Sequence, residues 1–367
     1  MTEPMSAWQG PWDGFQGHEQ VIVAEDAAIG FRAVIAIHST SLGPALGGTR
    51  MSTYAGAEQP QVAAYQDALR LSRAMSYKNA LAGLDHGGGK GVIIADPATK
   101  PREILHAYGR LVHTLGGRYL TAADVGMLVS DMDAVGETCQ WTTGMSPERG
   151  GLGDTGILTA VGVWQGIRAC AQATWGSADL SGRRIGVLGA GKVGGRLVGH
   201  LVGDGAEITV ADPDPNALAR ITQDHPGVQV TTDPTEVLGA DWDVLSPNAL
   251  GGVITADLVP RLSCRVICGG ANNPLAGPEV ADQLQAAGIL FAPDFMVNCG
   301  GVIQAAEEAI SGDLEQGRRK VMAVYQTTLR VIDRAKTTGA TPLAAAQAEA
   351  EDRMLAARAG SAAEQVR

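Results

Sequence analysis

The sequence of 367 residues lacks the features of a membrane protein and of a nucleic-acid-binding protein. It contains no run of eighteen apolar residues, and its first residues show no basic segment followed by an apolar one. Its formal net charge of −11 leaves no basic stripe for nucleic acid and disfavours contact with an anionic membrane. We therefore expect a soluble, cytoplasmic protein with neither kind of partner.

Cysteine is scarce and scattered. The five cysteines are an odd number without Cys-x-x-Cys spacing, which argues against a disulfide framework and against a zinc site. Within one strand, Cys264 and Cys268 would lie roughly 13 Å apart, at about 3.3 Å per residue, too far for a bridge. We expect reduced thiols, as in a cytosolic protein, and no metal.

Glycine is abundant, with 49 residues, and its clusters help to divide the chain. Residues 1–18 show no periodicity and are expected to form an arm or a disordered tail. Residues 147–153 are the best candidate linker. Strand and helix signals alternate before it, and repeated strand–helix units after it are typical of a doubly wound parallel sheet. The length favours two domains with a cleft between them, and we place the boundaries at 1–150, 151–310 and 311–367, the last a helical segment packing back toward the first domain.

A glycine-rich loop follows the apolar strand predicted at Arg184–Leu188. The loop has the spacing Gly-x-Gly-x-x-Gly, in which the glycines allow a tight turn, close approach to a pyrophosphate and close packing of helix on strand. Its expected binding residues are Gly189, Gly191, Lys192, Val193 and Gly194. Asp212 ends the next strand, where an acid meets ribose hydroxyls, and no Arg or Lys follows it to receive a 2′-phosphate. These features predict an NAD site, against the alternative of an ordinary glycine-rich turn.

Two lysines are candidates for the chemistry. An apolar helical stripe that starts at Ala64 leads to Lys78, and a buried ammonium must pair with a carboxylate or lose its proton. The alternative for Lys78 is a side chain at a helix end that reaches solvent. Lys90 follows three glycines, which suits the close approach of a small ligand. Two neighbouring lysines lower each other's pKa, so one could hold a substrate carboxylate while the other acts as a base.

Asp124 follows a predicted strand that starts at Tyr119 and offers a carboxylate that could exchange protons with an amine. Its alternative is a helix cap or a turn residue. Two competing functions share the cofactor fold. A 2-hydroxy acid dehydrogenase would need an Arg clamp and a His base, for which His86 is the candidate. A non-enzymatic NAD sensor would have no need of two lysines and an aspartate.

Several strings of residues resemble the glutamate, leucine, phenylalanine and valine dehydrogenases, most closely the valine and leucine members. They are Gly43–Arg50, Met75–Asn79, Gly87–Lys90, Thr121–Gly126 and Ala292–Gly301. The resemblance extends from about Gln20 to Glu308. It implies an α/β fold with an N-terminal substrate-binding and oligomerisation domain, a Rossmann-type NAD-binding domain and a helical C-terminal tail. The implied activity is NAD-dependent, reversible oxidative deamination of an apolar L-amino acid to its 2-oxo acid and ammonia, by a homo-oligomer.

The resemblance also implies roles for individual residues. Lys78 would bind the substrate carboxylate, Lys90 would activate the water that attacks the imine, and Asp124 would transfer protons at nitrogen. Thr159, Asn272 and Asn298 would contact the cofactor, and Asn272 the substrate as well. The substrate would be surrounded by Leu46, Gly47, Ala122, Val302 and Ala305. Two departures from the family are Cys299, where Ala is usual, and residues 153–156, which differ from the common linker of the leucine enzymes.

The side-chain pocket implied in this way is apolar and offers no partner to a second carboxylate, so we expect glutamate to be a poor substrate. Leu46 favours valine, leucine and isoleucine over aromatic side chains. Ala305 opens space where relatives carry a larger residue, and this keeps phenylalanine as an alternative.

Overall fold

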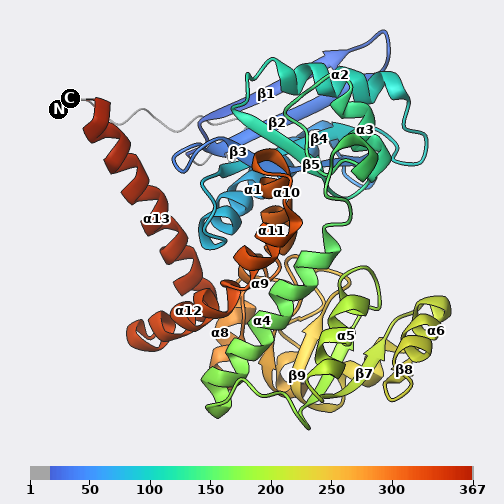
Figure 1. Cartoon of the computed structure of the whole chain (residues 1–367), viewed down its shortest axis with the longest axis vertical. Helices are drawn as coiled ribbons and strands as arrows, with labels where there is room; N and C mark the ends of the chain where they lie inside the picture. Colours follow the sequence, from blue (N-terminus) through green and yellow to red (C-terminus); the bar gives the residue numbers. More distant parts are fainter. Residues whose placement is uncertain (1–16, 366–367) are drawn as a thin grey trace. The chain divides into compact units, whose positions relative to one another are not determined.

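The computed structural model describes residues 17–365, with side chains up to residue 360, so most of the arm predicted at residues 1–18 lies outside it. Contacts divide the chain into two compact units (Figure 1). Unit 1 runs to Asp154 and includes Ala305–Asp313 and the chain from Arg353 onward. Unit 2 consists of Thr155–Gln304 and Leu314–Asp352. The boundaries at 150 and 310 stay predictions.

Unit 1 is built on a mixed sheet of order β1-β2-β4-β3-β5. Its strands are β1 (Gln20–Asp26), β2 (Phe31–Ser39), β3 (Ala45–Ser52), β4 (Gly87–Ile94) and β5 (Tyr119–Ala123). The pairs β1–β2 and β2–β4 are antiparallel, whereas β3 is parallel to both β4 and β5. The helices that pack with this sheet are α1 (Pro60–Leu81), α2 (Arg102–His113) and α3 (Val129–Gly136).

The sheet of unit 1 is buried on both faces, which explains the nearly continuous apolar run of β2. Ile35 and the other odd-numbered apolar residues of β2 pack with α2 and α3 residues such as Tyr108. Val34 and Ala36 pack on the opposite face, with Ala64 and its neighbours on α1. Side chains alternate along a strand, so each neighbouring strand also presents one set of residues to α1 and one to α2 and α3.

Unit 2 is built on a parallel sheet of order β11-β10-β9-β6-β7-β8. Its strands are β6 (Arg184–Leu188), β7 (Glu207–Ala211), β8 (Gln229–Thr231), β9 (Asp241–Pro247), β10 (Ser263–Ile267) and β11 (Leu290–Phe291). The direction of winding reverses between β6 and β9, which is where sheets of this kind bind ligands, at the carboxyl ends of the strands. The predicted α/β fold with a Rossmann-type sheet is confirmed.

Helices complete both units, and the helical C-terminal segment is also confirmed. They are the 3₁₀ helix η1 (Pro147–Arg149), α4 (Gly156–Trp175), α5 (Gly194–Gly203), α6 (Pro215–Asp224), α7 (Pro234–Leu238), the 3₁₀ helix η2 (Val259–Arg261), α8 (Glu279–Ala286), α9 (Asp294–Val297), α10 (Gly300–Ile310), α11 (Leu314–Val321), α12 (Val324–Thr338) and α13 (Pro342–Gln365). Among residues 17–365, no helix is long and apolar enough to cross a membrane. All five cysteines are free thiols and buried.

Candidate active site

Lys90 and Asp124 form a close ion pair in unit 1. The Nζ of Lys90, on β4, donates to Oδ2 of Asp124, directly after β5, at 2.7 Å. The Lys90 side chain is only 6% exposed and that of Asp124 is 21% exposed. An ammonium with so little access to water needs this partner, because an unpaired buried charge is costly. The structure thus brings together the two residues predicted to carry the acid–base chemistry.

The strand register places Lys90, Leu46 and Ala122 on one face of the sheet. Lys90 pairs with Ala36, which faces α1, and Arg50 on β3 pairs with Val92 on the same face. Leu46 and Ala122 follow the same alternation on β3 and β5. This face also receives α1, the helix that carries Lys78.

Lys78 lies in the last turn of α1 and is partly buried. The adjacent Asn79 fixes this part of the helix, because its side-chain amide donates to the carbonyl oxygens of Leu46 at 3.1 Å and Gly87 at 2.5 Å. Asn79 is fully buried, and it ties α1 to both β3 and β4. Lys78 is therefore carried by a helix turn that is bound directly to the strands of the site.

The glycines of β4 do not have the role that the sequence suggested. A Cβ on Gly88 would lie 2.1 Å from the backbone nitrogen of Ser76, and one on Gly89 would lie 2.6 Å from the ring of Tyr119. The expectation that these glycines clear space for a ligand beside Lys90 is therefore wrong, because protein atoms fill that space. The glycines instead allow α1 and the ring of Tyr119 to lie close to the backbone of β4.

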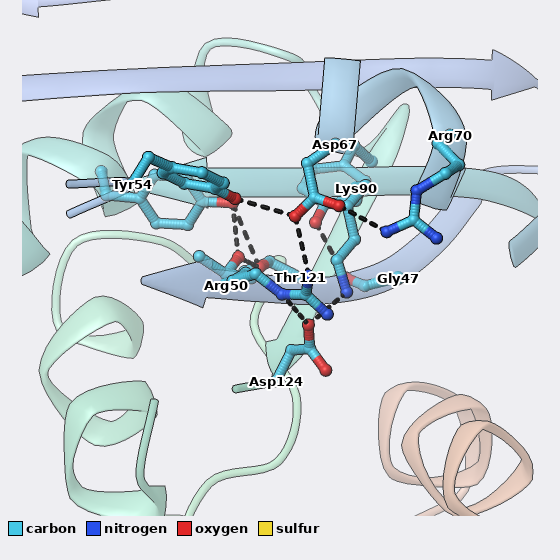
Figure 2. Close-up of polar contacts among 11 residues, drawn as sticks. Gly47, Arg50, Tyr54, Asp67, Arg70, Lys90, Thr121 and Asp124 are labelled. Atoms are coloured by element: carbon cyan, nitrogen blue, oxygen red, sulfur yellow. Dashed lines mark hydrogen bonds and ion pairs between the residues drawn. The ribbon is translucent and has the colours of Figure 1, made fainter. Parts of the chain in front are cut away.

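Asp124 has a second cationic partner, which the sequence analysis missed. The Nε of Arg50 donates to the same oxygen, Oδ2 of Asp124, at 3.2 Å. Burial alone would raise the pKa of Asp124, but Lys90 and Arg50 outweigh this effect and lower it to about 2. Asp124 is therefore ionised throughout the neutral range. Figure 2 shows both cations converging on this carboxylate.

The residues predicted around the substrate side chain are divided between the units. Leu46, Gly47, Ala122 and Ala305 belong to unit 1, and Val302 belongs to unit 2. Leu46 is fully buried, Ala305 is 3% exposed, and Ala122 and Val302 are partly buried. The Gly47 carbonyl accepts a hydrogen bond of 2.8 Å from the hydroxyl of Tyr119. His86 donates from Nδ1 to the carbonyl of Pro44 at 3.0 Å.

The glycine loop of unit 2 makes a tight turn that leaves backbone open to a dinucleotide pyrophosphate. Gly189 has a left-handed φ of +102°, and a Cβ there would lie 2.8 Å from that of Ala249. A Cβ on Gly194 would lie 1.9 Å from the carbonyl oxygen of Gly189, so the start of α5 packs directly on the loop. A Cβ on Gly191 would meet nothing within 4 Å, which leaves its backbone open to a ligand. Lys192 is exposed and Val193 partly buried beside it.

Asp212 fixes this loop. Its Oδ2 accepts the backbone N–H of Ala190 at 2.7 Å, and its Oδ1 accepts that of Asp214 at 2.8 Å. The carboxylate therefore stands beside the glycine loop in a fixed orientation. This arrangement fits a cofactor with a pyrophosphate and a ribose.

Asn272 and Asn298 also come together in unit 2. The Asn298 amide nitrogen donates to Oδ1 of Asn272 at 2.9 Å and to the carbonyl of Gly270 at 3.2 Å. Its Oδ1 is buried without a hydrogen-bond partner. A buried acceptor of this kind is costly, and a ligand amide could satisfy it, as the carboxamide of a nicotinamide would. Thr159 lies on α4, where its hydroxyl donates to the carbonyl of Thr155.

Two family models match nearly the whole chain. The model described as the dimerisation domain of Glu/Leu/Phe/Val dehydrogenase matches residues 18–141, and that described as Glutamate/Leucine/Phenylalanine/Valine dehydrogenase matches residues 150–358. The chain belongs to this family. It is an amino acid dehydrogenase, which acts on the CH–NH₂ group by oxidative deamination with a nicotinamide cofactor. Both the predicted family and the predicted class of enzyme are confirmed.

Individual relatives agree with this assignment. A valine dehydrogenase from Streptomyces coelicolor is 52% identical over 344 residues, which cover 93% of each chain. A leucine dehydrogenase from Bacillus subtilis is 42% identical over 338 residues, 92% of this chain and 91% of its own. The crystal structure of an L-tryptophan dehydrogenase from Nostoc punctiforme superposes with a TM-score of 0.81 at 36% identity, over 93% of this chain and 97% of that one.

Within residues 17–365, no group of three or more His, Cys, Asp or Glu side chains is arranged to hold a metal ion. The polar groups that the structure assembles are instead amines, carboxylates and amides. These groups can bind an amino acid and exchange protons with it.

Proposed function

We propose that this enzyme catalyses the NAD-dependent, reversible oxidative deamination of branched-chain aliphatic L-amino acids: valine, leucine and isoleucine. The observation that carries the reaction is the buried ion pair of Lys90 and Asp124, 2.7 Å apart, on the sheet face that also receives α1 with Lys78. In this set, Lys78 supplies a cation for the substrate carboxylate. Lys90 supplies a base for water, and Asp124 supplies a carboxylate for the substrate nitrogen. A 2-hydroxy acid has no amine for Asp124 to deprotonate.

The roles follow from the charges of these groups. The Lys78 ammonium binds the substrate carboxylate. Asp124, ionised at neutral pH, accepts a proton from the substrate ammonium, which frees the nitrogen lone pair for imine formation. Lys90 in its neutral form, after it has released its ammonium proton to solvent, accepts a proton from the water that attacks the imine carbon. The dinucleotide supplies the hydride acceptor when it is bound.

NAD is the proposed cofactor. Support comes from Asp212, whose two oxygens are fixed by backbone N–H groups beside the glycine loop. A 2′-phosphate placed near this carboxylate would meet a like charge, and the next residues, Pro213 and Asp214, offer no cation. Gly189, Gly191, Lys192, Val193 and Gly194 are proposed to bind its pyrophosphate, and Thr159, Asn272 and Asn298 its nicotinamide end.

Branched aliphatic substrates are proposed because the side chains of the candidate pocket, Leu46, Ala122, Val302 and Ala305, are all apolar. The valine and leucine dehydrogenases among the relatives agree with this proposal. Phenylalanine is the second candidate, favoured by the small side chain of Ala305. The structurally similar L-tryptophan dehydrogenase, which is named for an aromatic amino acid, supports this candidate.

The test is NADH formation at alkaline pH with L-valine, compared with L-lactate and with no substrate. We expect turnover with valine only. Turnover with lactate, or none with any of the apolar L-amino acids, would refute the proposed reaction. We also propose a homo-oligomer, since residues 18–141 match a dimerisation domain. Sedimentation of the purified protein as a monomer would refute that proposal.

A further inference from the structure

A network of charged and polar side chains is bonded to the proposed acid–base pair of Lys90 and Asp124 through Arg50. Arg50 stands between two carboxylates: its Nε donates to Oδ2 of Asp124 at 3.2 Å, and its Nη1 to Oδ2 of Asp67 at 2.7 Å. Asp67 lies on α1 and is 11% exposed, and the Arg50 side chain is 24% exposed. Arg50 therefore links α1 to the loop after β5 that carries Asp124.

Asp67 is itself held by two further donors. The hydroxyl of Tyr54 donates to its Oδ2 at 2.8 Å, and Nη2 of Arg70 donates to its Oδ1 at 2.7 Å. Tyr54 has a left-handed φ of 53°, a backbone conformation that side chains with a Cβ rarely adopt. The rest of the fold thus maintains an unfavourable backbone conformation at the residue that reaches Asp67.

Lys90 and Arg50 differ in what can happen to their charges. A lysine that serves as a base alternates between its charged and neutral forms, whereas a guanidinium stays protonated in proteins. Both cations bond to the same oxygen of Asp124, Oδ2. Figure 2 shows the second oxygen turned away from both of them.

We propose that Arg50, anchored by Asp67, is a positioning residue that holds Asp124 by Oδ2 while Lys90 exchanges its proton, so that Oδ1 is the oxygen that exchanges protons with the substrate nitrogen. This inference rests on the proposed role of Asp124. It assigns a role to an arginine that bonds to the acid–base pair rather than to the substrate.

The groups around Asp124 that bear on its titration come from several elements. Lys90 on β4 and Arg50 on β3 lower its pKa after burial has raised it, and the backbone N–H of Val125 lowers it further. Asp67 on α1 and the hydroxyl of Tyr54 lie on the far side of Arg50. Loss of one adjacent cation should raise a carboxylate pKa by about one to three units.

The experiment compares Arg50→Gln with Arg70→Gln. Both arginines bond to Asp67, but only Arg50 reaches Asp124, and Arg70 is 58% exposed in a surface ion pair. In full-length protein labelled with ¹³C at the Asp carboxyl carbons, the Asp124 signal is assigned by its loss in Asp124→Asn. The signal is then followed from pH 7 to the acid limit of folding.

We expect Asp124 in Arg50→Gln to protonate at least one pH unit above the wild-type enzyme. We also expect kcat to fall tenfold or more, with a smaller change in KM for the amino acid. Arg70→Gln should match the wild type in both. Arg50→Lys retains the positive charge but not the planar guanidinium with its several N–H donors, so its kcat should lie between those of Arg50→Gln and the wild type.

A titration of Asp124 in Arg50→Gln that matches the wild type would overturn the proposal, as would an equal shift in Arg70→Gln. If Arg50→Gln does not fold, Arg50→Met takes its place. If neither folds, Arg50→Lys decides, and a wild-type kcat in that variant overturns the proposal. Failure of the proposed function is a separate result, because it is the absence of amino acid turnover in the wild-type enzyme, whereas the titration needs no turnover.

Discussion

At the scale of single residues, the proposed chemistry depends on a carboxylate that is largely buried and on a lysine that is almost completely buried. An unpaired charge is costly in such a place, and the 2.7 Å contact between Nζ of Lys90 and Oδ2 of Asp124 offsets that cost. Removing one partner therefore leaves the other as an unpaired charge in a poorly hydrated place. A substitution at either residue should affect the chemistry more than the binding of the dinucleotide, which is assigned to unit 2.

We predict that Lys90→Ala and Asp124→Asn each lower kcat by about 10²- to 10⁴-fold, the usual loss when a general acid or base is removed. NADH affinity, measured by fluorescence titration, should change little in both variants. Lys78→Ala should instead mainly raise KM for the amino acid, since the charge of Lys78 binds the substrate carboxylate in both ground and transition states. A decrease of less than tenfold in kcat for both Lys90→Ala and Asp124→Asn would contradict the assigned roles.

The second prediction at this scale concerns Asp212. Asp212→Ala should lower kcat/KM with NAD and raise it with NADP, because both the ribose partner and the like charge near a 2′-phosphate are lost. The control is Asp214→Asn, which preserves the cap of α6, where the Asp214 side chain accepts the backbone N–H of Asn216 at 2.9 Å. Its effect on cofactor preference should be smaller. Equal kcat/KM with NAD and NADP in the wild type would refute the assignment.

At the scale of elements, the packing of α1 against β4 decides where Lys78 lies. Gly88→Ala would place a Cβ 2.1 Å from the Ser76 nitrogen and 2.3 Å from its Oγ, so α1 must move outward. We expect a loss of about 1–3 kcal/mol in the free energy of unfolding, and a raised KM for the amino acid. Gly203→Ala is the control, because a Cβ at the end of α5 would meet nothing within 4 Å. Urea unfolding measures both variants, and an equal loss in each would contradict this account.

A buried histidine that contacts α1 has a predictable effect on stability. His38 on β2 is 9% exposed, and its Nδ1 lies 2.8 Å from Oγ of Ser76 on α1. Burial, followed by the charges of His18, Arg73 and Arg358, lowers the pKa of His38 from 6.5 to about 4.

The sign of this effect follows from the unfolded state, in which the ring takes up a proton near pH 6.5 while the folded state resists protonation down to about pH 4. The contribution of His38 to stability is therefore complete above pH 6.5 and is lost as the pH falls toward 4. Between pH 6.5 and 5 this loss amounts to about 2 kcal/mol. His38→Gln should lose less stability than the wild type over this range. Equal slopes in urea unfolding at several pH values would contradict the prediction.

The elements also show where prediction from the sequence succeeded. Strands β6, β7, β9 and β10 were predictable because each is a short apolar run followed by a turn or a helix signal. β3 was missed, because Gly47 and Gly48 weaken the strand pattern at its centre. The function of Arg50 was missed with it, since Arg50 lies on β3 and bonds to Asp67 and Asp124, which are distant in sequence. β8 was missed because its three residues are too few to show periodicity.

At the scale of the whole molecule, the sequence predicted the fold class better than the contacts between residues that are distant in sequence. The glycine loop and the acid 23 residues later are local features, and they indicated the dinucleotide fold directly. The pairing of Lys90 with Asp124 depends on the order β4-β3-β5, which brings together residues 34 positions apart. No local pattern encodes that order, and the resemblance to a family implied only the roles of the two residues, not their pairing.

Substrate choice is the property of the whole molecule that the proposed pocket residues predict. Leu46, fully buried on β3, should restrict the pocket against aromatic rings, while the small side chain of Ala305 on α10 should widen it. An apolar pocket discriminates weakly, by about 1–3 kcal/mol for each methylene, but an unpaired carboxylate within it costs much more. We therefore expect kcat/KM to be highest for valine, leucine and isoleucine, lower for methionine and phenylalanine, and lowest for glutamate.

The paired variants Leu46→Ala and Ala305→Val separate the two contributions in this panel. Leu46→Ala should improve phenylalanine relative to valine tenfold or more, and Ala305→Val should do the opposite. Thermal unfolding of each variant serves as the control for stability, since truncation of a buried leucine costs about 2–5 kcal/mol. A wild-type preference for phenylalanine of tenfold or more would show that Ala305 rather than Leu46 sets the width of the pocket, because the space left by the small side chain would then outweigh the restriction by the larger one.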